Sequence, residues 1–537
     1  TRQKDSLCPF HKTNTARQGT VSEIFPSWEY LRVPQSLTDH DMTVFDSTAL
    51  LLTGVVLLLS LLLWLYPRRS SHLPPGPGFA LPLLGHLHLM GKDPRETFRK
   101  WRRQYGDIFS LYMGRQLTVV LNGHKVIKEA LVKQAHAFSD RPFFPLNDLV
   151  SEKKGIVLAS GAEWKTVRKA CLEILRDFGM GTNLLAQKIQ EEITEYIRTI
   201  ASKNGKPFDV TRLTQISVSN NICSILFGKR FDYDDQEFKD FMKAIDTVLA
   251  NQDSSVGALF PFVRHIPGDP FKARKTICDY RVLLDTFIQP IVTRHIQELD
   301  GGPNPPDDFI TAYLRRVRQD EADHKVSYIT EEGLPLVIFQ LFVAGSETTA
   351  TTLRWAVVYF LYHPDVQEKC HQEIVDVIGV DRSPTMQDRP EMTYLEATTT
   401  EILRIANIAP LNIPHATPCD VRISGWTIPK GTMVIPNLDS VLYDPEVWGD
   451  PDTFRPERFI GPDGKLIRYE EFIPFSTGRR VCLGESLARM ELFLYLAAMI
   501  QQFRFLPPED GQMPSLEGIL GVICSPKPFT FRAVPRL

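Results

Sequence analysis

The sequence has few cysteines, and no two of them form a C-x-x-C pair. Eight cysteines are scattered over 537 residues, which favours a reducing compartment and argues against a secreted scaffold held by disulfides. A surplus of one charge is also lacking, because 61 basic and 64 acidic side chains leave a net charge of −3. Nucleic-acid binders usually carry a basic surplus, so we expect no nucleic-acid partner.

Internal repeats and low-complexity tracts are also lacking. What the chain does have is 43% hydrophobic and 10% aromatic residues, enough to build the core of a large globular body. Because no second linker interrupts the later sequence, we predict one large, helix-rich domain over residues 86–537.

One segment does not look globular. Residues 47–66 form an uncharged, mostly aliphatic run of the length that crosses about 30 Å of hydrocarbon. Asp41 and Asp46 precede it and Arg68 and Arg69 follow it, so the positive-inside rule predicts a single-pass anchor with the downstream chain in the cytosol. A cleaved signal peptide is the alternative, but the run is longer than usual and lacks an A-x-A site.

The flanks of this anchor differ in composition. Residues 1–46 form a polar leader in which Met42 is a candidate for the natural start. Residues 67–85 contain the proline-rich stretch "HLPPGPGFALP". Proline fixes φ, so we predict a stiff, non-helical hinge between the membrane and the domain.

The stretch "FSTGRRVCLGE" places Cys482 between Gly478 and Gly484. Glycines let a bulky group approach the backbone, and the apolar spacing after Cys482 predicts that it stands at a helix N-terminus. The dipole and free N–H groups there favour a thiolate. A buried, inert thiol is the alternative for a lone cysteine.

In "FVAGSETTATTL" an apolar helical run is interrupted by Gly345, Glu347 and Thr348. One interpretation is a helix that tolerates threonines whose hydroxyls bond the i−4 carbonyl. The other is that Gly345 makes room for a ligand while Thr348 and Glu347 manage protons. The pattern alone does not choose between them.

Two charged pairs are weak signals when taken singly. Glu401 and Arg404 are i, i+3 neighbours, and most such pairs are surface bridges. Trp164 and Arg168 are i, i+4 neighbours whose N–H donors suit an anionic carboxylate. A cation–π pair on an ordinary helix is the alternative for them.

Taken in order, these motifs resemble one family. Residues 475–484 match the F-x-x-G-x-R-x-C-x-G haem loop, preceded by "PERF", the E-x-x-R pair and A-G-x-E-T-T. The chain thus resembles a cytochrome P-450, and more closely the animal microsomal family-2 type, from "PPGPGFALPLLG", "FSDRP", "NNICSILFGKRFDY" and "WTIPKGT". The resemblance covers residues 42–537 and implies a mainly α fold with small β-sheets, preceded by a single N-terminal transmembrane helix.

The resemblance also implies site residues. Cys482 matches the thiolate ligand of the iron of haem b, within a loop that includes Phe475, Gly478 and Gly484. Residues matching the propionate contacts are Trp164, Arg168, His415, Arg141 and Arg480. Residues matching the structural triad around the haem loop are Glu401, Arg404 and Arg458.

The implied reaction is monooxygenation of a lipophilic molecule with O2 and NADPH, in which Thr348 and Glu347 match the proton-delivering pair. The sequence has no G-x-G-x-x-G or P-loop motif, so electrons are expected from NADPH-cytochrome P-450 reductase, with cytochrome b5 serving some family members. The basic residues expected to form the partner's docking surface are Lys165, Lys169, Arg479 and Arg489. An ordinary solvated face is the alternative.

The resemblance further implies the endoplasmic reticulum membrane and contact with its lipid. The segments expected to line the substrate pocket lie near Phe143, Phe260, Asn412 and Val522 and are largely apolar, which suits fatty acids, steroids or xenobiotics alike. Asn412 is a polar exception, which we expect to orient a carbonyl or hydroxyl of the substrate. A haem-thiolate isomerase or dehydratase and a non-enzymatic haem-binding protein are the alternatives, although such isomerases often lose the acid–threonine pair.

Overall fold

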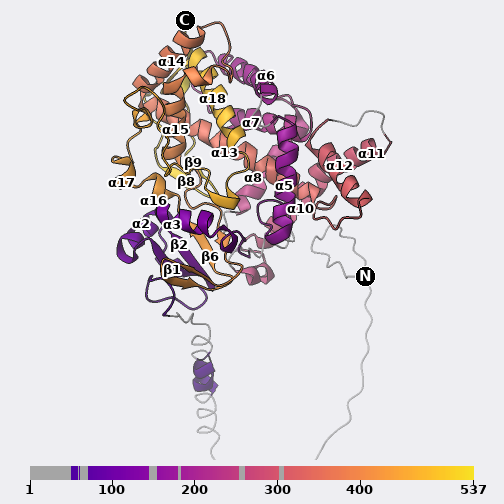
Figure 1. Ribbon diagram of the computed structural model, residues 1–537, viewed down its shortest axis with the longest axis vertical. Coiled ribbons are helices and arrows are strands. Elements are labelled where there is room, and N and C mark those ends of the chain that lie inside the picture. Colours follow the sequence, from indigo (N-terminus) through magenta and orange to yellow (C-terminus); the bar gives the residue numbers. More distant parts are fainter. Residues whose placement is uncertain are drawn as a thin grey trace, which may run out of the picture.

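The protein is mainly helical, with small sheets, in the computed structural model (Figure 1). The structure describes residues 50–57, 60, 71–143, 154–179, 183–252, 260–301 and 307–536. The helices are α2 Pro94–Tyr105, α3 His124–Lys128, α5 Gly161–Asp177, α6 Asn183–Ala201, α7 Thr211–Leu226, α8 Gln236–Gln252, α10 Ala273–Leu283, α11 Gln289–Gly301, α12 Phe309–Ala322, α13 Leu334–Tyr362, α14 Pro364–Ile378, α15 Thr393–Ala406, α16 Asp439–Leu442, α17 Pro445–Trp448 and α18 Glu485–Gln502. The predicted helix-rich class is confirmed.

Four short strands form the largest sheet, in the order β1-β2-β6-β3. Its strands are β1 Ile108–Met113, β2 Gln116–Leu121, β6 Met433–Pro436 and β3 His415–Ala416. Strands β2 and β6 pair in parallel, with Thr118 opposite Met433, so segments far apart in sequence are joined. The two-stranded sheets pair β4 Val421–Ile423 with β5 Trp426–Ile428, β7 Phe503–Leu506 with β10 Arg532–Pro535, and β8 Gly518–Leu520 with β9 Cys524–Pro526.

Helix α13 runs through the middle of the molecule (Figure 1). It begins after Gly333 with Pro335 in its first turn, where the missing N–H of proline costs no hydrogen bond. Among the described residues it is the one helix long and apolar enough to cross a membrane, yet 67% of its apolar window is buried in the protein. Because it is apolar nearly all round and packs against α7, α15 and α18, α13 is a core helix.

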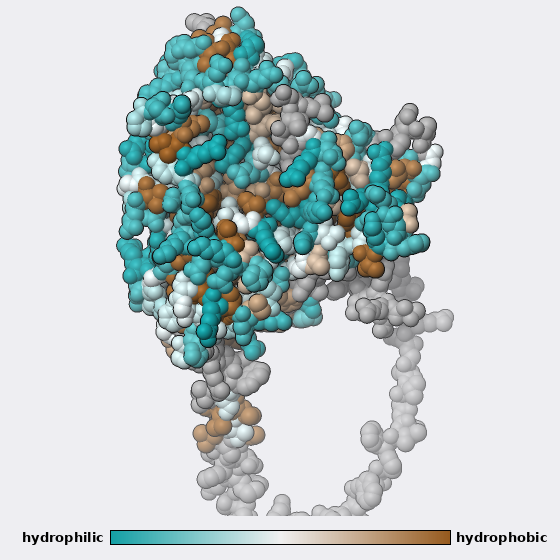
Figure 2. Space-filling view, in the orientation of Figure 1, coloured by the Kyte–Doolittle hydropathy of each residue, from teal (hydrophilic) through white to brown (hydrophobic). Residues whose placement is uncertain are grey.

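The predicted anchor lies mostly outside the described residues. Residues 50–57 are helical, and their leucines are exposed, with Leu50 at 73%. Figure 2 shows apolar atoms on this segment, whereas the face of the main body seen there is largely hydrophilic. The leader 1–46 and Arg68 and Arg69 are also outside the described part, so the anchor and its orientation stay predictions.

The described part of the proline-rich hinge, from residue 71 onward, contains no helix before residue 87. It lies along β1, since Ser110 donates to the Pro75 carbonyl through its N–H and to the Pro74 carbonyl through its hydroxyl, both over 2.7 Å. Leu73 is buried as well. This segment is therefore attached to the sheet rather than standing free of the domain.

Candidate active site

A large cavity of about 300 Å3 lies between α5, α7, α13 and the loop that leads into α18. The predicted site residues that line it are Arg141, Trp164, Arg168, Thr348, Phe475, Arg480, Cys482 and Gly484. The predicted site residues that are not among the lining residues are Glu347, Gly478, His415 and the triad Glu401, Arg404 and Arg458. Segments from distant parts of the sequence therefore bring most of the predicted set to one cavity.

Cys482 lies just before α18, which begins at Glu485. Its side chain is accessible from the cavity, and its N–H donates to the Phe475 carbonyl over 3.0 Å. Burial raises the pKa of the thiol above its ordinary value, and the N–H groups of Gly484 and Glu485 lower it only in part. The expected preference for a thiolate is thus not met by the protein alone, because burial outweighs the helix terminus; metal binding deprotonates such a thiol.

Gly478 explains the shape of this loop. Its φ is +78°, and a Cβ there would lie 1.9 Å from the Leu131 carbonyl oxygen. Only glycine fits both the left-handed conformation and this close approach. Gly478 therefore supports the loop from behind instead of facing the cavity.

Three arginines gather at one end of the cavity, and none of them has an acidic partner among the described residues. Arg480 donates to the carbonyls of Ser139 and Ala159, over 2.8 and 2.6 Å, and its guanidinium lies 3.7 Å from the centre of the Trp164 ring. Burial and then the charge of Arg141 lower the pKa of Arg480 to about 8.

Within the described part of the chain, the other two arginines bond to backbone carbonyls alone. Arg141 Nη1 donates to the carbonyls of Ile413 and Pro414, each over 2.8 Å, and Arg168 Nη2 donates to that of Val481 over 2.5 Å. Burial lowers the pKa of both side chains. Buried cations are normally paired, so this end of the cavity is suited to an anionic group.

Two buried ring nitrogens add to this picture. Trp164 Nε1 and His415 Nε2 have no hydrogen-bond partner among the described residues. His415 Nδ1 lies 2.6 Å from the Phe138 carbonyl, so Nδ1 carries the proton of the neutral ring. Burial, Arg141 and Arg480 hold the pKa of His415 well below its usual value. These unpartnered groups beside unpaired cations fit the carboxylates of haem.

Helix α13 presents Thr348 to the cavity. Its hydroxyl donates to the Ala344 carbonyl over 2.7 Å, as expected for a threonine bonding to the i−4 carbonyl. The oxygen retains lone pairs that can accept from a water. Gly345 also lines the cavity, but a Cβ there would lie 2.4 Å from Ile222 Cδ1, so close packing against α7 also requires a small residue.

Glu347 is bonded elsewhere. Its Oε1 accepts from Gln215 Nε2 on α7, and the carboxyl does not line the cavity. Burial raises its pKa, the Gln215 bond lowers it, and the charge of Asp246 raises it further. Its predicted place beside Thr348 in sequence therefore does not bring it to the same wall, and its role in proton delivery stays a prediction.

The predicted triad forms a separate, fully buried cluster. Glu401 accepts from Arg404 Nε over 2.7 Å and from Arg458 Nε over 3.1 Å. Arg404 also donates to the carbonyls of Leu442 and Pro451. This is no solvated surface bridge, since Glu401 and Arg404 are both 0% exposed, and it joins α15 to the segment before the haem loop.

The expected pocket segments differ in position. Asn412 lines the cavity, but its Nδ2 donates to Ser476 Oγ over 2.8 Å and its Oδ1 accepts from the Ile413 N–H. Phe143, Phe260 and Val522 are not among the described lining residues, and residues 144–149 of the segment predicted near Phe143 lie outside the described part of the chain. Apolar lining among the described residues comes from Ile156, Val157, Ile222, Leu226, Leu341, Leu403, Ile408 and Leu438.

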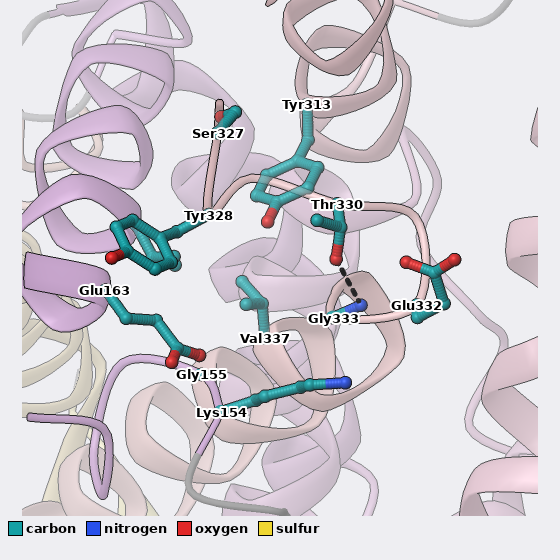
Figure 3. A pocket seen from close by; sticks show the side chains of 11 residues that line it. Lys154, Gly155, Glu163, Tyr313, Ser327, Tyr328, Thr330, Glu332, Gly333 and Val337 are labelled. Atoms are coloured by element: carbon teal, nitrogen blue, oxygen red, sulfur yellow. Dashed lines mark hydrogen bonds between the residues drawn. The ribbon is translucent and has the colours of Figure 1, made fainter. Parts of the chain in front are cut away.

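Figure 3 shows a second cavity, of about 190 Å3, between α5, α12 and the start of α13. Thr330 Oγ1 accepts there from the N–H of Gly333 over 3.2 Å, and Glu163 lies on the same wall as Lys154. None of the predicted site residues lines this cavity, so the larger cavity is the candidate site.

The expected basic surface is partly paired. Lys165 and Arg479 are exposed, whereas Lys169 lies 3.7 Å from Glu173 and Arg489 lies 2.9 Å from Glu485.

Sequence reasoning missed two polar residues of the large cavity. Gln340 of α13 accepts through Oε1 from the N–H groups of Ile156 and Val157, over 2.7 and 3.0 Å. Glu491 of α18 also lines the cavity and is 1% exposed. The available signal was an amide or carboxyl within an apolar stretch of a helix, because such a group needs a partner when it is buried.

Comparisons with known proteins agree with this geometry. A family model described as cytochrome P450 matches residues 74–533. Cytochrome P450 2U1 of Homo sapiens is 39% identical over 535 residues, which cover 94% of this chain and 96% of that protein. Cytochrome P450 2B4 of Oryctolagus cuniculus is 39% identical over 486 residues, covering 88% and 97%, and cytochrome P450 2J2 of Homo sapiens is 37% identical over 492 residues, covering 91% and 96%. The chain belongs to the cytochrome P450 family, and it is a monooxygenase whose haem b is ligated by a cysteine thiolate.

Proposed function

We propose that this protein is a membrane-anchored monooxygenase that hydroxylates or epoxidises lipophilic small molecules, and that Cys482 would supply the thiolate that holds its haem iron. One observation carries the proposal. Among the described residues, Cys482 is the only cysteine that lines the large cavity, and Thr348 of α13 lines the same cavity. The thiolate-ligated iron of the bound haem favours cleavage of the O–O bond of dioxygen.

The protein's part in holding haem is electrostatic. We assign the propionates to Arg141, Trp164, Arg168, Arg480 and His415, because these side chains present unpaired cations or unpartnered ring nitrogens. The propionates would raise the pKa of His415, so that Nε2 gains a proton and donates.

Thr348 is assigned the placement of water in the cavity. Its hydroxyl proton is directed to the Ala344 carbonyl, so its oxygen is left to accept a hydrogen bond from a water. An ordered water passes protons more readily than a mobile one, because the acceptor is already within hydrogen-bond reach. Glu347, which its bond to Gln215 holds behind this wall, is assigned the supply of protons to that water.

Lipophilic substrates follow from the lining of the cavity. Leu341, Ile408 and Leu438 are among the aliphatic side chains that face it, and such a surface favours apolar molecules that leave water on binding. We therefore include fatty acids, steroids and xenobiotics. Asn412 is less suited to orient them than the sequence suggested, since both ends of its amide already have partners.

The electrons come from a redox partner, a reductase in the related proteins. We propose NADPH-cytochrome P450 reductase as the main partner and cytochrome b5 as a second one. The exposed Lys165 and Arg479 favour an acidic docking face on the partner, since complementary charge speeds association.

Membrane association is indicated by the microsomal relatives, and we propose a single-pass anchor in the endoplasmic reticulum with the catalytic domain in the cytosol. The exposed leucines of residues 50–57 support this, because a helix with such a surface is stable in lipid and not in water.

The test is product formation with reductase. Purified protein, reductase and NADPH are incubated with a fatty acid, a steroid and a xenobiotic under isotope-labelled dioxygen, with reductase omitted as the control. We expect a product that contains labelled oxygen and forms only with reductase. A product that forms without reductase and contains no labelled oxygen would instead identify an isomerase or dehydratase. Haem binding without any product would identify a non-enzymatic carrier.

A further inference from the structure

One buried carboxyl in the wall of the large cavity has no role in the proposed function so far. Glu491 of α18 is 1% exposed and lines the cavity. Its Oε1 accepts from Asn221 Nδ2 of α7 over 2.9 Å. Its Oε2 has no hydrogen-bond partner among the described residues. One half of the carboxyl is therefore held while the other half is left without a protein partner.

Among the described residues, no cation acts on the pKa of Glu491 to stabilise its carboxylate. Asn221 faces it from α7, Thr349 from α13, and Tyr495 is the titratable group nearby on α18 itself. A buried charge whose only donors are neutral is costly. Burial accordingly raises the pKa of Glu491 to about 8, although Asn221 and Thr349 lower it in part. At neutral pH this geometry favours the acid, with its proton on Oε2.

Neither residue of the predicted acid–threonine pair offers a proton to the cavity. Thr348 directs its hydroxyl to the Ala344 carbonyl, and Glu347 is outside the lining. Thr349, next to Thr348, is buried and also lines the cavity. Glu491 and Thr349 thus place an acid and a hydroxyl on the same wall.

We propose that Glu491 is a proton-supplying residue of this monooxygenase and passes its Oε2 proton to a water held by the Thr349 hydroxyl. The Oε2–H bond breaks, an O–H bond forms on that water, and the water releases another proton farther into the cavity; no electrons are exchanged. Asn221 holds the resulting carboxylate until solvent water returns a proton. The inference rests on the proposed function, because monooxygenation consumes protons and an isomerisation does not.

The protonation state is tested first, on the haem-loaded protein without turnover. Infrared difference spectra are recorded at pH 7 between the wild type and Glu491→Gln, in H2O and in D2O. We expect the carbonyl band of a protonated carboxylic acid, shifted in D2O, in the wild type and not in the variant. Glu446→Gln, which removes an exposed carboxyl of α17, should leave this band in place. A difference spectrum with carboxylate bands only would overturn the proposal.

Turnover is tested next, as product formed per NADPH consumed. We expect Glu491→Gln and Thr349→Val to lower product formation by about 100-fold or more, the usual contribution of a positioned acid, and to raise hydrogen peroxide per NADPH. Thr351→Val makes the same change at a buried residue of α13 that does not line the cavity. This variant should form as much product per NADPH as the wild type. Thr349→Val keeps the test open if Glu491→Gln does not fold.

The pH profile separates a proton source from a merely structural residue. Coupling in the wild type should fall as pH rises through about 8, whereas in Glu491→Gln it should be low at every pH. Equal coupling and equal pH profiles in wild type and Glu491→Gln would overturn the proposal. If the wild type itself forms no product with reductase, the proposed function fails instead, and the infrared band still reports on Glu491.

Discussion

At the scale of single residues, the chemistry depends on which polar groups reach the large cavity. Thr348→Val keeps size and β-branching but removes the hydroxyl, so haem should still bind and still be reduced. Without the hydroxyl the water is no longer held, and proton delivery should fail by up to the 100-fold to 10,000-fold that positioned acid catalysis typically contributes. Product per NADPH should fall while hydrogen peroxide per NADPH rises, when all three are measured in one reaction.

The matched control for Thr348 is Thr351→Val, because Thr351 is buried on the same helix outside the cavity lining. It should leave coupling unchanged. Unchanged coupling in the Thr348 variant itself would remove the water-holding role and reopen the isomerase interpretation.

Glu491 also makes a prediction about stability. Its pKa is about 8 in the folded protein and close to 4.3 in an unfolded chain. Between these two pKa values the folded protein keeps the proton of Glu491, whereas the unfolded chain has released it. The free energy of unfolding of the wild type therefore falls as pH rises, by up to about 1.4 kcal/mol per pH unit. Glu491→Gln does not titrate. Its melting temperature relative to the wild type should therefore rise from pH 6 to pH 8, and a constant difference would contradict this.

Cys482, Thr348 and the basic residues of the cavity could be predicted from the sequence, because each stands in a motif with a characteristic spacing of residues. Glu491 was missed because "ELFLYLAAMIQQF" is apolar nearly all round, and periodicity in such a helix does not say which side faces a cavity. The sequence also did not show that Glu347 faces away from the cavity lined by Thr348, because successive residues on a helix point in different directions.

At the scale of elements, the buried Glu401 cluster joins α15 to the segment before the haem loop. Removing one partner of a buried pair leaves the others unpaired and costs about 3–5 kcal/mol. We therefore expect Glu401→Gln to lower the thermal stability of the haem-loaded protein strongly. Glu457→Gln, which breaks an exposed bridge to Lys369, should cost at most about 1 kcal/mol. Equal losses in the two variants would show that the cluster does not hold this region.

The elements differ in how far they could be predicted. Helix α13 is long and apolar, so its existence followed from the sequence. The strands β3 to β6 are two to four residues long, too short to show an alternating pattern. The pairing of β2 with β6 joins residues near 118 and 433, and no local pattern specifies such a contact.

At the scale of the whole molecule, the anchor determines which side of the membrane carries the catalytic domain. Arg68 and Arg69 after the apolar run predict a cytosolic domain. Protease added to intact microsomes should therefore degrade this domain, as it does after detergent treatment. Full protection in intact microsomes, lost on adding detergent, would mean a lumenal domain.

The central claim is that Cys482 ligates the haem iron, and it is tested most directly by the absorption spectrum of the ferrous carbonyl complex. Wild-type protein should show the red-shifted Soret band of a thiolate-ligated haem. Cys482→Ser should lose that band, whereas Cys419→Ser, which changes an exposed cysteine, should keep it. Retention of the thiolate band in Cys482→Ser would contradict the assignment.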